Sequence, residues 1–176
     1  MAGLTHVETD RLILRLPEPD DAAAFTRLIT PEISRWLGAW PVPFDHDRAS
    51  RKIADCRAAA EADKQLPLVI TRRADGEILG WLSISRNPGI SGRGVLSYWL
   101  GDAFHRQGIL REAATAAIAA ARVHMGITSL EATCHLDNAA SAGALRALGL
   151  RPIRDGMLWI EARQTYEPVT FFEDSP

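Results

Sequence analysis

The sequence is poor in the features that mark several classes of protein. It has only two cysteines, Cys56 and Cys134, and they form neither a disulfide framework nor a metal-binding pattern. No stretch approaches the roughly 20 apolar residues that a membrane-spanning helix needs, and residues 1–8 lack the apolar core of a signal peptide. The formal net charge of −2 gives no reason to expect a nucleic acid or a membrane as partner. We therefore expect a cytoplasmic protein without a metal.

What the chain does contain is typical of a globular domain. Its 176 residues are 47% hydrophobic and 24% charged, which is enough length and apolar content for a sizeable core. The sequence shows no internal repeat, linker or low-complexity segment. These observations predict a single domain over residues 1–176.

Hydrophobic periodicity and turn residues predict an α/β (mixed α+β) fold. Strands and helices alternate along the chain, and an Asp-Gly turn joins two of the strands into a hairpin. This order favours a central mixed, mostly antiparallel sheet of about seven strands with helices packed on it. We expect strands at 9–15, 66–72, 78–86, 95–100, 129–135, 157–162 and 165–172, and helices at 22–29, 31–38, 47–63, 113–122 and 139–148, with Gly126 ending the fourth helix.

The junction between the strand at 95–100 and the long alanine-rich helix carries the clearest chemical signal. A short loop with Arg106, Gly108 and Arg111 precedes a helix start, where free N–H groups and the positive end of the helix dipole meet. Such a junction binds anions, phosphates above all. Many similar junctions bind nothing, and this one has neither the P-loop spacing nor the dinucleotide Gly-x-Gly-x-x-Gly. An anion site and a plain structural turn both remain open.

An aromatic and proline-rich connector spans residues 36–44. It contains Trp36, Trp40 and Phe44. Two interpretations stay open: the connector plugs one edge of the core, or it forms a wall over a substrate pocket, as functional loops often do.

Four segments together resemble the GNAT superfamily of acyl-CoA N-acyltransferases, and within it the branch of ribosomal-protein N-terminal alanine acetyltransferases (the Rim type). The likeness spans nearly the whole chain, and the order and spacing of the segments carry it. They are Glu8-Thr9-Asp10-Arg11-Leu12-Ile13-Leu14-Arg15; Asp75-Gly76-Glu77-Ile78-Leu79-Gly80; the junction with Glu112-Ala113; and Asn138-Ala139-Ala140-Ser141 followed by Leu148-Gly149-Leu150.

The resemblance implies a GNAT-like sheet, with helices on both faces, that splays between its fourth and fifth strands, those ending at Leu100 and His135. It implies that acetyl-CoA is the co-substrate and that its pantetheine arm lies in the gap near Trp99 and Leu100. Asn138 would contact that arm, although helix capping explains the residue equally well. The pyrophosphate would be held by the backbone N–H groups of Arg106, Gln107, Gly108, Ile109, Leu110 and Arg111.

Two positions depart from the family pattern in ways that affect catalysis. Leu145 stands where many members place a tyrosine that protonates the leaving thiolate, so Ser141 becomes the nearest candidate acid and cofactor contact. Val95 stands where related sequences often have a glutamate suited to act as a general base. Tyr98, His135 and His105 are possible bases or water anchors, and each has an alternative, purely structural role.

The reaction implied by the resemblance is direct attack of a primary amine on the acetyl thioester in a ternary complex. The acceptor is the N-terminal α-amine of a protein or peptide, or a small-molecule amine, and the protein is a monomer or a homodimer. At neutral pH roughly one α-amine in ten is neutral, so the missing carboxylate at Val95 favours a low-pKa amine. The alternatives are a catalytically silent acyl-CoA-binding sensor or partner protein and a phosphate-binding enzyme unrelated to coenzyme A.

Overall fold

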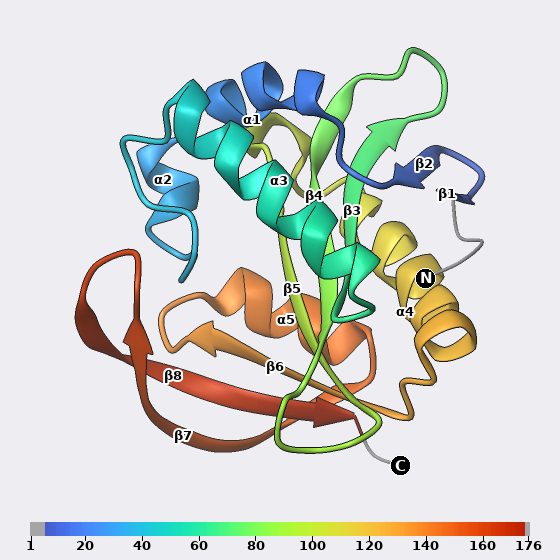
Figure 1. Ribbon diagram of the computed structural model, residues 1–176. Coiled ribbons are helices and arrows are strands. Elements are labelled where there is room, and N and C mark those ends of the chain that lie inside the picture. The colour runs from blue at the N-terminus through green and yellow to red at the C-terminus, as the bar shows by residue number, and fades with distance from the viewer. Residues whose placement is uncertain (1–5, 175–176) are drawn as a thin grey trace.

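The computed structural model, which describes residues 6–174, contains one eight-stranded sheet in the order β1-β2-β3-β4-β5-β6-β8-β7 (Figure 1). All neighbouring strands are antiparallel except β5 and β6, which run parallel. The strands are β1 His6–Glu8, β2 Leu12–Arg15, β3 Gln65–Arg72, β4 Ile78–Arg86, β5 Arg93–Leu100, β6 Ser129–His135, β7 Leu150–Ile160 and β8 Thr165–Asp174. The predicted mixed, mostly antiparallel sheet is confirmed, with eight strands instead of about seven.

The extra strand is β1, which lies before the first predicted strand. The expected strand at 9–15 is the second half of a hairpin, β1–β2, whose turn is closed by a 2.9 Å hydrogen bond from Thr9 N to Leu12 O. Short polar side chains at Thr9 and Asp10 favour a turn over an extended strand. The prediction therefore merged a turn with the strand that follows it.

The strand before the last was also predicted too short. β7 begins at Leu150, whereas the sequence indicated a start at Met157. Residues 151–155 are exposed, so they lack the buried, alternating apolar positions that mark a strand in sequence. Pairing with β8 over its whole length, interrupted by a bulge between Pro152 and Arg154, is what keeps this edge strand extended.

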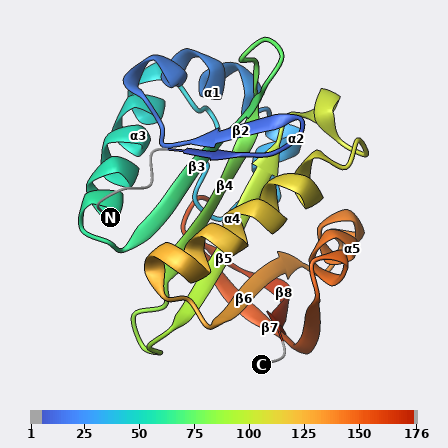
Figure 2. The ribbon, with the colours of Figure 1, turned by 90° about the vertical axis from the view of Figure 1, so that its right-hand side faces the viewer.

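Helices cover both faces of the sheet, as expected (Figure 2). The helical segments are η1 Pro19–Asp21, α1 Ala22–Leu28, α2 Pro31–Ser34, α3 His46–Glu61, η2 Asp102–Phe104, α4 Ile109–Met125 and α5 Ala139–Ala147. α2 ends at Ser34, before the predicted stop at Gly38, whereas Gly126 ends α4 in a left-handed conformation (φ 64°) as predicted.

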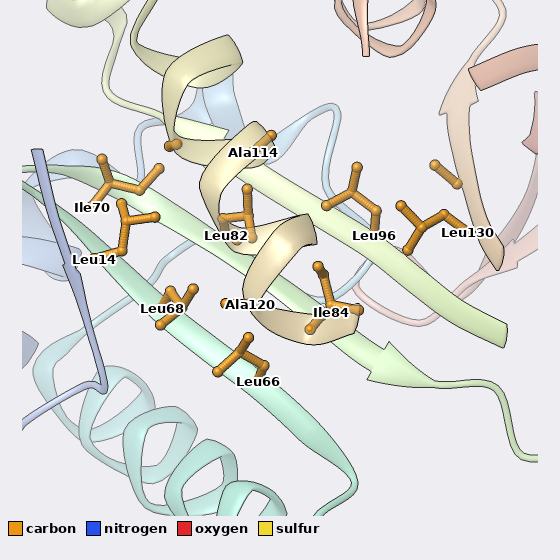
Figure 3. Packing of buried hydrophobic residues seen from close by; sticks show 14 of the residues in the cluster. Leu14, Leu66, Leu68, Ile70, Leu82, Ile84, Leu96, Ala114, Ala120 and Leu130 are labelled. Carbon is orange, nitrogen blue, oxygen red and sulfur yellow. The ribbon is translucent and has the colours of Figure 1, made fainter. Parts of the chain in front are cut away.

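α4 packs against one face of the sheet through its alanines. Ala113, Ala114, Ala117 and Ala121 are fully buried, and their small side chains let the helix lie close above the strands. The aliphatic side chains of β2–β6 fill the space beneath it (Figure 3). On the other face, α1–α3 enclose a second cluster that is rich in aromatic rings.

The sheet forks between β5 and β6. The two strands pair at three positions, Arg93 with Ser129, Gly94 with Leu130 and Val95 with Glu131. Beyond these positions β5 continues to Leu100 and β6 to His135 without pairing with each other. β6 turns away from β5 toward α5 (Figure 2). The predicted splay is therefore confirmed, and it opens directly beside the junction that leads into α4.

Candidate active site

The loop between β5 and α4 has an unusual backbone. Arg106 and Gly108 both adopt left-handed conformations, with φ values of 60° and 75°, and α4 starts immediately afterwards. A left-handed arginine is uncommon and costs energy that glycine does not pay. The loop is braced from inside, because the Gln107 side chain donates a 2.8 Å hydrogen bond to Ala103 O.

The same loop presents free donors. Within residues 6–174, no atom accepts a hydrogen bond from the backbone N–H groups of residues 106–111. The first intrahelical bond of α4 is the 3.1 Å contact from Glu112 N to Gly108 O. Arg106 and Arg111 are exposed beside these donors, so partial and formal positive charges gather at one spot, which favours a phosphate.

The side chains of the loop leave that spot open. Ile109 is buried and Leu110 packs partly buried against the core beneath α4. The GNAT pattern that the sequence resembles has glycine or alanine at the position of Leu110. Because Leu110 packs toward the core, its larger side chain stays away from the exposed N–H groups. The loop therefore offers backbone, with arginines at the rim, to a ligand.

Strand register decides which peptide groups of β5 face the fork. Gly101 N donates to Leu79 O at 2.9 Å, and β4 and β5 pair without a bulge from Gly80–Leu100 onwards. Hydrogen-bonded and non-hydrogen-bonded pairs alternate along an antiparallel ladder, so Trp99 bonds to β4 whereas the peptide groups of Tyr98 and Leu100 face the gap. Of the two residues predicted near the pantetheine arm, Leu100 is therefore the one with main-chain groups on that side.

Tyr98 and Ser141 meet on the helix side of the fork. The Tyr98 hydroxyl lies 2.9 Å from Ser141 Oγ and donates to Ser141 O at 3.3 Å. Burial raises the pKa of Tyr98 to about 12, partly offset by the hydrogen bond with Ser141, so the phenol keeps its proton at neutral pH. Two of the three predicted catalytic side chains thus form one hydroxyl pair.

Asn138 holds Ser141 in place. Its side-chain oxygen accepts a 3.0 Å hydrogen bond from Ser141 N, which makes Asn138 the N-cap of α5. The capping interpretation of Asn138 is confirmed, and a ligand contact remains a prediction. Leu145 is fully buried in the same helix, so the position of the usual tyrosine belongs to the core here.

His135 lies apart from this pair. Its neighbour Cys134 belongs to the core under the helices, and successive residues of a strand point to opposite faces, so His135 projects from the other face. There its ring centroid is 5.7 Å from that of Trp36, and its Nδ1 accepts a 3.1 Å hydrogen bond from Asp137 N. His105, the other histidine considered, lies 3.0 Å from Leu100 O through Nε2, a contact that fixes the loop.

The two ends of the connector at 36–44 have different surroundings. Trp40 and Phe44 are buried among the aromatic rings of the second core, whereas Trp36 is half-buried and faces His135. The β7–β8 hairpin docks on the same segment, because Arg163 donates to Ser34 O and Leu37 O at 3.1 Å each. Trp40 and Phe44 therefore fill the core. Trp36 lies beside His135 at the open end of the gap between β5 and β6, which we call the mouth of the fork.

A carboxylate missed by the sequence analysis lies at this mouth. Glu167 of β8 forms a two-pronged ion pair with Arg163, and its pKa lies below the ordinary value, chiefly through the hydrogen bond from Arg163, with a smaller contribution from His135. Nothing in the local sequence singles it out, since it becomes interesting only when β8 pairs with β6.

Comparison with known proteins settles the family. The model of the acetyltransferase (GNAT) domain matches residues 11–151. The chain belongs to the GNAT acetyltransferases. It is thus an enzyme of a family that moves acetyl groups, which confirms the resemblance inferred from the sequence motifs. No protein of curated function matched the chain.

Solved structures agree with the GNAT fold. A putative ribosomal-protein-serine acetyltransferase from Vibrio cholerae superposes with a TM-score of 0.86 at 23% identity over 100% of both chains. RimJ of Mycobacterium smegmatis, solved with a coenzyme A disulfide, superposes with a TM-score of 0.77 at 22% identity, over 92% of this chain and 80% of RimJ. The microcin C7 self-immunity acetyltransferase MccE, solved with acetyl-CoA and AMP, gives 0.81 at 20% identity over 96% of this chain and 94% of MccE.

Residues 6–174 contain no group of three or more His, Cys, Asp and Glu side chains placed to hold a metal ion. The helices in this part of the chain are all too short or too polar to cross a membrane.

Proposed function

We propose that this GNAT protein transfers the acetyl group of acetyl-CoA to a primary amine by direct attack in a ternary complex, with residues 1–176 acting as one acyl-CoA N-acyltransferase domain. The observation that carries the proposal is the row of free N–H donors at 106–111, at the positive end of α4 and beside the open edge of β5. A diphosphate and an extended polar arm are the ligand features that these two neighbouring surfaces suit.

In this proposal each part of the coenzyme meets a different kind of partner. The backbone of Arg106 to Arg111 holds the pyrophosphate, and the Tyr98 peptide groups, which face the gap, bond the pantetheine arm in the manner of an added strand. Asn138 contacts the arm from the start of α5. RimJ and MccE, both solved with a form of coenzyme A, support the choice of ligand.

The main chain and the hydroxyl pair then have separate tasks. Leu100 N–H stabilises the oxyanion that forms when the amine attacks the thioester carbon, because it faces the gap and not β4. As the new C–N bond forms and the C–S bond breaks, Ser141 gives its proton to the departing thiolate. The Tyr98 hydroxyl, which keeps its proton up to high pH, replaces that proton through the 2.9 Å contact, and water then returns a proton to Tyr98.

The groups that act on the attacking amine lie on the opposite face of the sheet from the hydroxyl pair. His135, beside Trp36 and near Glu167, orients the water that takes the proton from the attacking amine and passes it to solvent, because its Nδ1 already accepts from Asp137 N and its neutral Nε2 carries the ring hydrogen. Val95 carries no carboxylate, so a weakly basic α-amine suits the site better than a lysine side chain. We therefore propose an α-amine of a protein or peptide as the preferred acceptor, with a small-molecule amine second. The names of the ribosomal-protein acetyltransferases among its structural neighbours support this order.

A catalytically silent acyl-CoA-binding sensor or partner protein is the second candidate. Leu145 and Val95, which replace the usual acid and base, favour it. Both candidates fit a cytoplasmic monomer or homodimer, and the two free thiols, Cys56 and Cys134, are compatible with a reducing compartment.

Ligand-dependent unfolding tests the coenzyme site. Coenzyme A or acetyl-CoA at about 100 times its Kd stabilises the protein by about 2.7 kcal/mol, which raises the Tm of a chain of this size by roughly 5–10 °C. ATP, which has phosphates but no pantetheine arm, serves as the control and gives a smaller shift. No shift with either form of the coenzyme refutes the proposal.

Thiol release then separates the two candidates. One peptide has a free α-amine and no lysine, and its partner has an acetylated α-amine and one lysine. We expect release of coenzyme A with the first peptide and little with the second. Stabilisation by acetyl-CoA without thiol release on any peptide or small amine supports the silent binding protein instead.

A further inference from the structure

The loop between β5 and α4, which carries the proposed pyrophosphate donors at 106–111, is tied to a distant part of the chain. The tie is Glu112, in the first turn of α4. Its carboxylate accepts hydrogen bonds from Thr9 Oγ1 at 2.6 Å, Arg11 N at 3.0 Å and Arg11 Nε at 2.7 Å. Burial opposes ionisation of Glu112, but these donors outweigh it, so its pKa lies below the ordinary value. The β1–β2 turn is therefore clamped to the start of α4.

Arg11 extends this clamp to the loop itself. While its Nε bonds Glu112, its Nη1 donates a 3.0 Å hydrogen bond to Gln107 O. Gln107 lies between the left-handed residues Arg106 and Gly108, so its carbonyl belongs to the strained part of the loop. A charged donor on that carbonyl stabilises a conformation that an arginine at position 106 would otherwise disfavour.

The bond also sets the direction of a free donor. In a trans peptide, C=O and N–H point in opposite directions. Because Gln107 O points at Arg11, the N–H of Gly108 points away from Arg11, toward the side where the loop is open. Gly108 is close to the guanidinium as well, since a Cβ atom there would lie 3.4 Å from Arg11 Nη2. The guanidinium thus occupies the back of the loop and leaves its front to a ligand.

From this geometry we propose that Arg11, oriented by Glu112, is a positioning residue for the coenzyme: it holds the 107–108 peptide with its N–H toward the pyrophosphate. The inference rests on the proposed function, because it adds residues that hold the same coenzyme-binding loop in place. Arg11 touches no ligand in this account. Its effect is to keep the donors in place before the coenzyme arrives, which lowers the cost of binding.

Arg73 provides a matched control. It is as exposed as Arg11 (51% against 53%), and it holds the same turn through a 3.0 Å bond to Thr9 O and a 3.0 Å ion pair with Glu8. Within residues 6–174 it makes no hydrogen bond or ion pair with the loop. Replacing either arginine by methionine removes one charge, one hydrogen bond to a backbone carbonyl and one ion pair. Only Arg11→Met removes the bond to Gln107 O.

The experiment measures the Kd of coenzyme A by calorimetry, KM and kcat with acetyl-CoA, and the Tm of each variant. We expect Arg11→Met to raise Kd and KM about tenfold with kcat at saturation unchanged, and Arg73→Met to change Kd less than about twofold. Glu112→Gln is uncharged, and its one side-chain oxygen cannot accept both from Arg11 Nε and from Thr9 Oγ1 with Arg11 N. It therefore raises Kd in the same direction, and the double variant with Arg11→Met adds little, because both break one clamp.

Equal Kd values for the wild type and Arg11→Met overturn the inference. So does an equal loss in the two methionine variants that follows their loss of Tm, because that result describes a purely structural arginine. A wild type that does not bind coenzyme A refutes the proposed function itself, and the clamp then has no ligand to serve.

Discussion

β5 has two very different neighbours. On one side it pairs with β4 from Gly80–Leu100 to Arg86–Gly94 without a break, and on the other it pairs with β6 at Arg93, Gly94 and Val95 alone. The first side is closed by aromatic and aliphatic packing on both faces, whereas the second offers unpaired peptide groups beside a loop with free N–H donors. The same strand therefore serves stability on one edge and, in the proposed function, ligand binding on the other.

The difference between the two edges of β5 predicts which measured property a substitution at each edge should change. A change at the β4 edge disturbs a close backbone contact, and its effect should appear in the free energy of unfolding. A change at the β6 edge or on α5 touches few core atoms, and its effect should appear in binding and turnover.

The largest effect is expected from Gly80→Val at the closed edge. A Cβ atom at position 80 would lie 2.3 Å from Trp99 O and 2.9 Å from Leu100 Cα, and backbone atoms cannot move aside as a side chain can. We expect a loss of about 3 kcal/mol or more in the free energy of unfolding, measured by urea denaturation. Gly143→Ala in α5, where no atom lies within 4 Å of the added Cβ, serves as control and gains about 0.5–1 kcal/mol. A stable Gly80→Val protein would show that the two strands are not so tightly joined.

The next effect is expected at the fork, from the hydroxyl pair. Ser141→Ala removes the proposed proton donor and should lower kcat about 100-fold with Tm nearly unchanged. Tyr98→Phe keeps Ser141 Oγ but removes its 2.9 Å partner, so we expect a loss of only several-fold. Initial rates of thiol release at saturating acetyl-CoA measure both. If Ser141→Ala retains the wild-type kcat, the thiolate takes its proton from elsewhere, and this edge of the fork only binds.

Local features of the sequence predicted most of the closed part of the molecule. The Asp75-Gly76 turn, the bounds of β6 and the stop of α4 at Gly126 all depend on residues close together in the chain, and the structure confirms them. The position of the fork was predicted through the family motifs. Its depth was not, because the point where β5 and β6 separate depends on how both pack against helices elsewhere.

The contacts that define the candidate site join residues that are far apart in the sequence, so local sequence patterns could not predict them. Tyr98 and Ser141 are 43 residues apart, and Arg11 and Glu112 are 101 apart. In the sequence, Glu112 and Arg11 stand out only as members of two separate motifs. No periodicity or turn rule relates such positions, so only the folded sheet shows that they meet.

Amide exchange sharpens the comparison within β5 itself. Without coenzyme, the Leu100 amide, which faces the gap, should exchange at least about tenfold faster than that of Trp99, which bonds to β4. Coenzyme A should slow exchange at Leu100 and leave Trp99 nearly unchanged. Hydrogen exchange followed by NMR measures both sites in one sample. Equal protection of the two amides in the free protein would mean that the gap-side groups already have partners.

The smallest effect concerns acid stability and the clamp beside the fork. The pKa of Glu112 lies below its ordinary value of 4.5 in the folded protein, so the unfolded state binds the proton more tightly. Ionised Glu112 therefore stabilises the fold above about pH 4.5, and this contribution disappears as the pH falls through the lower, folded-state pKa.

Glu112→Gln should consequently cost about 1 kcal/mol at neutral pH and progressively less at acidic pH, where the protonated wild-type side chain resembles glutamine. Urea denaturation of both proteins between pH 7 and about pH 3 measures the difference directly. Glu167 and Asp75 also have lowered pKa values, but both proteins retain them, so their contributions cancel in the difference. A difference that stays constant with pH, or grows on acidification, would mean that the clamp does not depend on the charge of Glu112, and that a neutral hydrogen bond is enough to hold the first turn of α4 against the β1–β2 hairpin.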